Sequence, residues 1–217
     1  MVARLRKRKT KVSVARDLEA ELSRILVKTG ATRFGLFKLS SGKLSPYYID
    51  LRMIPGDPKA LHTVIEIYEK MTKSKIGLPS FDRVAGVPTA GVPYASILAY
   101  ELTKPFLYVR RDAKTHGGGR RIEGQLLPGE RVVLVDDLIT TGKNTLEAAE
   151  AIRAEGGVVQ HAIVLIDRQE GGPAALAQAG LKLHAFTTVT KIARRMRESG
   201  LVDDDQYKAI LAQIEHA

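Results

Sequence analysis

The residues from Val132 to Gly142 have the types and the order needed to bind a phosphorylated sugar. Apolar residues lead into the adjacent acids Asp136 and Asp137, and a Thr-Thr-Gly turn then precedes a predicted helix. This order would place acids, hydroxyls and a bend at the carboxyl end of a strand, where open α/β sheets bind ligands. Carboxylates accept hydrogen bonds from ribose hydroxyls, and the free N–H groups of a helix start bind phosphate. The segment predicts a ribose 5-phosphate site, with an acidic turn before an ordinary helix cap as the alternative.

Two further segments carry groups that suit a diphosphate. Residues 86–91, Gly-Val-Pro-Thr-Ala-Gly, connect a predicted strand to a helix and expose backbone amides with little side-chain bulk. A plain strand-to-helix turn would explain them equally well. Residues 110–119 hold three cations and a histidine before three glycines, which predicts an arm that closes over a leaving diphosphate or, alternatively, a solvated basic loop. The His-Gly-Gly-Gly string also occurs in lipases, but the Gly-x-Ser-x-Gly elbow of those hydrolases is missing from this chain.

Strands that alternate with helices must position these segments. We predict strands over residues 83–87, 106–109, 131–135 and 158–166 and near 183–187, and helices over 92–102 and 144–154 and near 173–178. This alternation indicates an α/β protein whose parallel sheet has right-handed crossovers. Before it, a helix over 14–28 and short strands with a tight turn in 32–54 are expected, and Asp57 should cap the next helix. Two amphipathic helices complete the chain.

Composition limits the classes of function. A chain of 217 residues with 44% apolar content can bury the core of one domain. The absence of cysteine excludes disulfides, thiol nucleophiles and cysteine-ligated metals. No run approaches the roughly 18 to 20 apolar residues that span a membrane, and no apolar region follows the basic amino terminus as it would in a secretory signal. We therefore expect a cytoplasmic protein with no membrane partner.

The net charge of +10 invites comparison with nucleic-acid-binding proteins. Six of the positive charges lie in residues 1–11, which contain no acid, and a second basic cluster lies in residues 104–121. Two compact basic segments can bind small polyanions as well as nucleic acid. We predict a disordered basic tail over residues 1–12 and one domain over 13–217, and we do not expect a nucleic-acid partner.

Taken together, these motifs resemble the orotate phosphoribosyltransferases of the type I phosphoribosyltransferase family, from about Thr32 to Gly172. Residues 34–48 look like the amino-terminal base-binding portion, and residues 110–116 fall on the mobile catalytic loop. Residues 136–144 fall on the phosphoribosyl pyrophosphate (PRPP) motif, and residues 167–172 look like the family's Asp-Arg-x-Glu-Gly-Gly. The resemblance implies a central parallel sheet flanked by helices, with a small amino-terminal hood to which residues 32–54 contribute.

The resemblance also implies a role for each matching residue. Lys114 and His116 would be catalytic and would neutralise charge on the departing diphosphate. PRPP would be bound by Arg110, Arg111, Lys114, His116, Asp136, Asp137, Leu138, Ile139, Thr140, Thr141, Gly142, Lys143 and Asn144. Orotate would be bound by Thr140, Arg168, Tyr47 and Tyr48, although the two tyrosines are equally well explained as core aromatics.

The implied reaction joins N1 of orotate to C1 of the ribose of PRPP and gives orotidine 5′-monophosphate and pyrophosphate, on the de novo route to UMP. Mg²⁺ would be carried mainly by the substrate, without a direct protein ligand. Members of the family are generally homodimers, and loop 110–120 would complete the site of the neighbouring subunit.

The chain departs from the family pattern at two positions. Ser40 stands where many members have lysine, and Lys38 or Lys43 could supply that charge. Arg111 stands where similar enzymes often have lysine, so a planar fork replaces a compact ammonium.

Three alternatives stay open at this stage. The first is a phosphoribosyltransferase for another nucleobase, which Arg168 disfavours because it suits an acidic base. The second is a non-catalytic, nucleic-acid-binding regulator of the same fold, which the complete Lys114 and His116 loop disfavours. The third is one half of a bifunctional UMP synthase, but no decarboxylase-sized segment follows Ala217.

Overall fold

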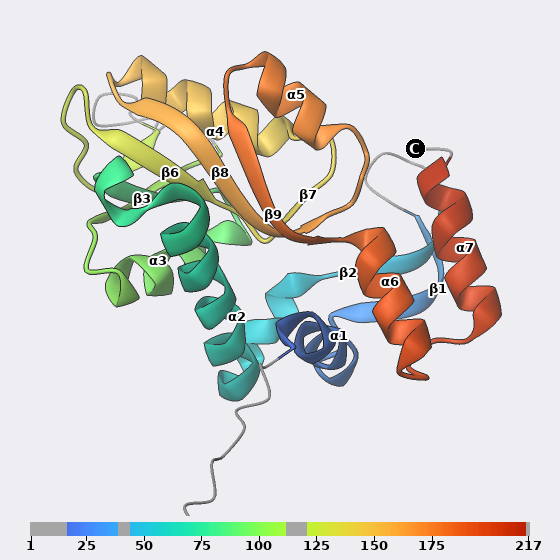
Figure 1. The fold of residues 1–217 in the computed structure, drawn as a ribbon. Coiled ribbons are helices and arrows are strands. Elements are labelled where there is room, and N and C mark those ends of the chain that lie inside the picture. The colour runs from blue at the N-terminus through green and yellow to red at the C-terminus, as the bar shows by residue number, and fades with distance from the viewer. Residues whose placement is uncertain (1–16, 39–43, 112–120, 216–217) are drawn as a thin grey trace, which may run out of the picture.

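The computed structural model describes residues 17–38, 44–111 and 121–215. Its helices and strands alternate through most of the chain, as the sequence predicts (Figure 1). In chain order they are α1 (Leu18–Lys28), β1 (Thr32–Lys38), β2 (Leu44–Ile49), η1 (Leu51–Gly56), α2 (Pro58–Met71), η2 (Thr72–Ile76), η3 (Leu78–Ser80), β3 (Arg83–Gly86), α3 (Gly91–Glu101), β4 (Phe106–Val109), β5 (Ile122–Glu123), β6 (Arg131–Val135), β7 (Leu138–Ile139), α4 (Lys143–Ala154), β8 (Val158–Asp167), α5 (Gly172–Gln178), β9 (Lys182–Thr188), α6 (Val189–Glu198) and α7 (Asp204–Glu215).

The central sheet has the strand order β5-β4-β3-β6-β8, and β7 and β9 both pair with the long strand β8. All these pairs are parallel except β4 with β5. Strand β6, Arg-Val-Val-Leu-Val, is rich in β-branched residues and is buried beyond its first residue, as expected for a central strand covered on both faces. Because β3, β6 and β8 run parallel, their carboxyl ends lie at one edge of the sheet. The predicted mostly parallel α/β sheet is thus confirmed.

Two apolar cores cover the two faces of this sheet. The larger core joins α1, α2, α3 and α6 to side chains such as Val133, Val135 and Ile163. The smaller core joins α4 and α5 to Leu134 and Val164 on the opposite face. Successive strand residues point to opposite faces, which explains why neighbours in β6 and β8 enter different cores. Among the described residues, no helix is long and apolar enough to cross a membrane.

The antiparallel hairpin of β1 and β2 lies beside the sheet, next to α1 and α7 (Figure 1). Its buried residues Tyr47 and Ile49 belong to the same apolar core as the sheet. The hydroxyl of Ser45 in β2 also lies 2.6 Å from Oε1 of Gln213 in α7. The hairpin therefore forms the hood that the sequence predicts, continuous with the main core.

Most predicted boundaries agree with the observed ones within two residues. Asp57 caps α2 as expected, because its Oδ1 accepts hydrogen bonds from the N–H groups of Lys59 and Ala60. The helix predicted over residues 14–28 begins at Leu18, after the capping residue Asp17. The two-residue strands β5 and β7 were not predicted, because two residues are too few for a periodic pattern. The predicted tail, residues 1–12, lies outside the described residues.

Gly91, the first residue of α3, has no room for a side chain. A Cβ atom there would meet the carbonyl oxygen of Val135 and would lie 2.8 Å from the Cα of Asp136. We predict that Gly91→Ala lowers the free energy of unfolding by about 1 to 3 kcal/mol, because rigid backbone must move apart. Gly56→Ala is the matched control, since nothing lies within 4 Å of a Cβ at that position. Equal stability of the two variants in denaturant titrations would contradict the prediction.

His161 and His184 face one another from adjacent strands β8 and β9. Nε2 of His184 lies 3.2 Å from Nδ1 of His161, and His184 is only 8% exposed. Burial, aided by the charges of His161 and Lys182, lowers the pKa of His184 from 6.5 to about 4. Burial also lowers the pKa of His161. Between pH 6.5 and about 4, the unfolded chain therefore binds protons that the folded protein does not bind.

From this difference we predict that the free energy of unfolding falls as the pH is lowered from 6.5 towards 4. The variant His184→Gln should flatten this part of the pH profile of chemical denaturation. His62→Gln is the control, because His62 is exposed on α2. An unchanged slope in His184→Gln would show that the pair does not titrate on unfolding.

Candidate active site

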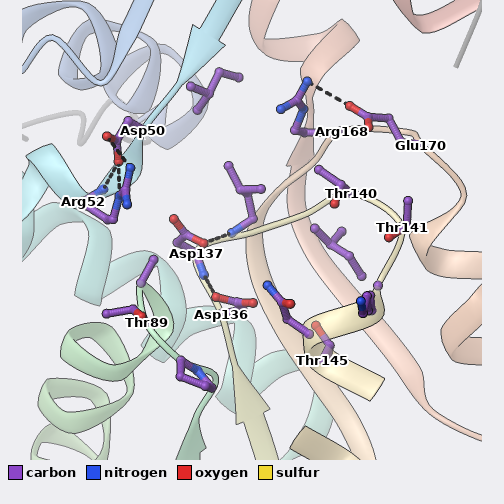
Figure 2. A pocket seen from close by; sticks show the side chains of 18 of the residues that line it. Asp50, Arg52, Thr89, Asp136, Asp137, Thr140, Thr141, Thr145, Arg168 and Glu170 are labelled. Atoms are coloured by element: carbon purple, nitrogen blue, oxygen red, sulfur yellow. Dashed lines mark hydrogen bonds and ion pairs between the residues drawn. The ribbon is translucent and has the colours of Figure 1, made fainter. Parts of the chain in front are cut away.

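A cleft of about 700 Å³ lies at the carboxyl ends of the central strands (Figure 2). It brings together segments that are far apart in the sequence: the second hood strand, the loop after β3, the turn between β6 and α4, and the end of β8. The residues that line it are Lys38, Tyr48, Ile49, Asp50, Arg52, Pro88, Thr89, Ala90, Arg111, Asp136, Asp137, Leu138, Ile139, Thr140, Thr141, Gly142, Lys143, Asn144, Thr145, Arg168 and Glu170.

The two adjacent acids lie on the floor of this cleft, directly after β6. Asp136 and Asp137 are each 8% exposed. Oδ1 of Asp136 accepts a hydrogen bond from the N–H of Asp137 at 2.9 Å, and Oδ1 of Asp137 accepts one from the N–H of Leu138 at 2.7 Å. Burial raises the pKa of both carboxyls, and the charge of Asp137 raises that of Asp136 further. Their remaining oxygens are suited to accept hydrogen bonds from a ligand's hydroxyl groups.

Two buried tyrosines support the backbone beneath the acids. The hydroxyl of Tyr68 in α2 donates to the carbonyl oxygen of Asp136 at 2.6 Å, and that of Tyr94 in α3 donates to the carbonyl of Leu51 at 2.5 Å. Both rings are fully buried, with centroids 5.8 Å apart. The helices on one face of the sheet therefore fix both the end of β6 and the entry to η1.

Helix α4 begins at the cleft without a side-chain cap. Its first residue is Lys143, and the preceding Gly142 adopts φ +85°, a left-handed conformation that favours glycine. The first N–H groups of a helix have no intrahelical partner, and no side chain of the described residues caps those of α4. The same holds for α3, which follows the loop of residues 86–91, whereas α1, α2 and α6 carry capping side chains. Helix α4 thus points free backbone donors at the cleft, whereas at the start of α3 the N–H of Gly91 donates to the carbonyl of Val87 and Pro93 has no N–H.

Arg168 enters the cleft from the end of β8. Its side chain is 6% exposed, its guanidinium lies 5.5 Å from the ring centroid of Tyr47, and its Nη2 lies 2.9 Å from Oε1 of Glu170. Although Arg168 and Glu170 are close enough for an ion pair, Nε and Nη2 of Arg168 have no well-oriented hydrogen bond among the described residues. Unmet donors on a buried cation indicate a missing acceptor, and a planar guanidinium matches a carboxylate.

Several residues of the cleft were not predicted as site residues. Asp50 and Arg52 follow the second hood strand, and Oδ1 and Oδ2 of Asp50 accept hydrogen bonds from Nε and Nη2 of Arg52 at 2.6 and 2.8 Å. This pair lies on the side of Asp137 away from Arg168 and Glu170 (Figure 2). Thr145 also lines the cleft without having been predicted. Lys38 and the 88–90 loop line it too, and both have a place in the sequence analysis: residues 86–91 as a candidate diphosphate contact and Lys38 as a possible replacement for the charge missing at Ser40. Asp50 and Arg52 had no sequence signal.

The structure brings most of the predicted site residues together. Residues 136–144, Arg111, Arg168 and Tyr48 all line the cleft. Tyr47 does not line it but lies buried beneath Arg168. Arg110 also lies outside the lining, and its Nη1 lies 3.2 Å from Oε1 of Glu123. Lys114 and His116 fall in residues 112–120, outside the described residues.

Comparison with known proteins gives a consistent result. Residues 58–199 match the family model described as phosphoribosyl transferase domain. The orotate phosphoribosyltransferase of Cenarchaeum symbiosum is 41% identical over 188 residues, which cover 87% of this chain and 94% of that protein. The crystal structure of orotate phosphoribosyltransferase from Aeropyrum pernix aligns with a TM-score of 0.71 at 35% identity, over 82% of this chain and 99% of the other. The structure of Leishmania donovani UMP synthase aligns with a TM-score of 0.83 at 36% identity. The alignment covers 92% of this chain and 42% of the other.

Proposed function

The chain belongs to the phosphoribosyltransferase family and, within it, to the orotate phosphoribosyltransferases, and from this premise we propose roles for the residues of its cleft. It is a pentosyltransferase of pyrimidine biosynthesis that transfers the 5-phosphoribosyl group of PRPP to N1 of orotate. The products are orotidine 5′-monophosphate and pyrophosphate. The observation that carries the residue roles is the arrangement of the cleft, with acids and free helix donors on its floor and the buried, under-satisfied Arg168 beside them.

The floor of the cleft fits the ribose 5-phosphate half of PRPP. Asp136 and Asp137 accept hydrogen bonds from the ribose hydroxyls, and the backbone N–H groups of residues 140–145 hold the 5-phosphate at the start of α4. The hydroxyls of Thr140 and Thr141 and the side chains of Lys143 and Asn144 border the same turn. Residues 88–90, at the start of α3, and Arg111 lie where they can hold the diphosphate.

The base lies between the hood and the end of β8. Arg168 holds the orotate carboxylate with two parallel N–H donors, which satisfies Nε and Nη2, the groups without a well-oriented hydrogen bond in the described part of the chain. Tyr48 and Thr140 border the same part of the cleft. Tyr47 acts indirectly, because its buried ring supports the guanidinium of Arg168.

The reaction inverts C1 of the ribose and passes through a cation-like ribosyl transition state, so charge grows on the departing diphosphate. Lys114 and His116 neutralise that charge, as in similar enzymes. Both residues lie outside the described part of the chain, and their roles follow from the match to the family motif.

Mg²⁺ accompanies the diphosphate of PRPP and neutralises part of its charge when bound. This ion is usually held by one or two carboxylates together with substrate phosphates. Asp136 and Asp137 offer such carboxylates in the cleft, while the described ranges contain no cluster of three or more metal-binding side chains. An ion at this site would therefore take most of its ligands from PRPP. Excess chelator should abolish turnover, and unchanged turnover under those conditions would contradict this role.

The remaining roles concern assembly and location. We propose one catalytic domain over residues 13–217 behind a basic tail, working in the cytoplasm as a homodimer in which residues 110–120 complete the neighbour's site. Full specific activity in a sample diluted until it is monomeric by light scattering would contradict the shared site.

The preference of the enzyme among nucleobases tests the proposed role of Arg168 most simply. Pyrophosphate release from PRPP should be measured with orotate, uracil, adenine and hypoxanthine. Orotate should be strongly preferred over uracil, which lacks the carboxylate, because a site built around a polar group discriminates strongly against an analogue without it. Equal turnover of uracil and orotate would show that the cleft does not recognise the carboxylate.

A further inference from the structure

The turn that follows β8 has an unusual backbone. Gln169 adopts φ +62° and Gly171 adopts φ +90°, so two of the residues that follow Arg168 are left-handed. Glycine takes this conformation freely, but a glutamine takes it at a cost in free energy. A left-handed glutamine persists only where its surroundings hold it in place.

Hydrogen bonds on both sides of the turn hold Gln169. Its N–H donates to Oδ1 of Asp167 at 2.8 Å. Its side-chain Oε1 accepts from the N–H of Thr190 at 3.1 Å and from the hydroxyl of Thr190 at 2.5 Å. Thr190 lies in the first turn of α6, where backbone N–H groups lack intrahelical partners. The side chain of Gln169 therefore ties the turn to the start of α6.

The hydrogen bonds between Gln169 and Thr190 determine where the neighbours of Gln169 point. Arg168 and Glu170 both line the cleft, while the side chain of Gln169 between them bonds to α6. Among the described residues, the charged side chain nearest to the guanidinium of Arg168 is Glu170, at 2.9 Å, and Glu170 belongs to the same turn. The placement of the guanidinium depends on the backbone of the turn and on the ring of Tyr47 beneath it.

We infer that Gln169 and Thr190 are positioning residues that aim Arg168 at the carboxylate of the base. This inference rests on the proposed role of Arg168. Neither residue lines the cleft, so their effect should appear in the binding of orotate and not in the chemical step.

The test compares Gln169→Ala with a matched glutamine elsewhere. Gln206 in α7 also accepts a backbone hydrogen bond through its Oε1, from the N–H of Asp203 at 3.0 Å, and it does not line the cleft. Gln169→Ala should raise the orotate dissociation constant about 5- to 10-fold, the scale of one or two net hydrogen bonds. Its kcat and its KM for PRPP should change less than about twofold, and Gln206→Ala should leave all three values unchanged.

Substitutions of Thr190, the hydrogen-bond partner of Gln169, test the same contact and include a rescue. Thr190→Val removes the hydroxyl donor and should weaken orotate binding, whereas Thr190→Ser keeps the donor and should restore it. In an Arg168→Ala background, Gln169→Ala should have no further effect on orotate binding, because the two residues act as one unit.

The outcomes separate this inference from the proposed function. If Arg168→Ala weakens orotate binding but Gln169→Ala does not, the positioning role is overturned while the role of Arg168 stands. A loss in Gln169→Ala that is equal for both substrates, or that persists undiminished in the Arg168→Ala background, would also overturn it. If Arg168→Ala leaves orotate binding unchanged, both proposals fall.

Discussion

Replacing Arg168 by alanine is expected to weaken orotate binding by about 100-fold, because truncating one partner of a buried charged pair costs about 2 to 5 kcal/mol. The guanidinium is 6% exposed, and its Nε and Nη2 have no well-oriented hydrogen bond among the described residues. The binding of PRPP should change little, since its proposed site is formed by the turn after β6 and by α4. The measurement is calorimetric titration of the variant with orotate and, separately, with PRPP.

The same substitution should leave the fold intact. Glu170, the ion-pair neighbour of Arg168, keeps a side chain that is 23% exposed, so water can solvate its charge when the arginine is removed. The free energy of unfolding should therefore stay within about 1 kcal/mol of the parent value. Arg168→Lys keeps the charge without the planar fork and should bind orotate with intermediate affinity. Arg194→Ala, on the exposed surface of α6, is the control. Unchanged orotate affinity in Arg168→Ala would exclude a carboxylate contact.

The second large effect is expected at Lys114. Lys114→Ala should reduce kcat by about 100- to 1000-fold, the usual range for losing one preorganised group that stabilises transition-state charge. Orotate affinity should change far less, because the lysine is proposed to act on the leaving diphosphate. Single-turnover measurements with saturating substrates would separate the chemical step from binding and product release.

A surface lysine provides the control for this experiment. Lys59→Ala, at an exposed position in α2 outside the lining of the cleft, removes the same charge and should keep full turnover. If Lys114→Ala lowered turnover and orotate affinity by the same factor, the lysine would be a general binding residue and not a leaving-group contact.

The sequence predicted the parts of the site that are local in the chain. Acids, turn and helix start lie within residues 136–145, and their order alone places them at the end of one strand. Asp50 and Arg52 could not be predicted in this way, because they reach the cleft through the packing of the hood against the sheet. The contact between His161 and His184 depends in the same way on the register of two parallel strands.

The sequence alone could have shown that the two tyrosines of the hood do not share one role. Adjacent residues of a strand point to opposite faces, so Tyr47 and Tyr48 could not both line one cleft. The structure buries Tyr47 at 2% exposure and turns Tyr48 to the cleft. Strand alternation excludes a shared role, but which tyrosine faces the cleft depends on how the hairpin is docked.

Backbone hydrogen bonds connect the two ends of the cleft. The N–H of Arg168 donates to the carbonyl of Ile139, and the N–H of Gly172 donates to the carbonyl of Thr140. These bonds join the turn that is proposed to hold phosphate to the turn that carries Arg168. The spacing between the phosphate and the carboxylate of one product molecule is therefore set by backbone contacts.

A crystal structure with orotidine 5′-monophosphate bound would test this account most directly. We predict the phosphate on the backbone N–H groups of residues 140–145, the ribose hydroxyls on Asp136 and Asp137, and the carboxylate on Arg168. A phosphate bound away from α4, or a carboxylate turned away from Arg168, would contradict the account.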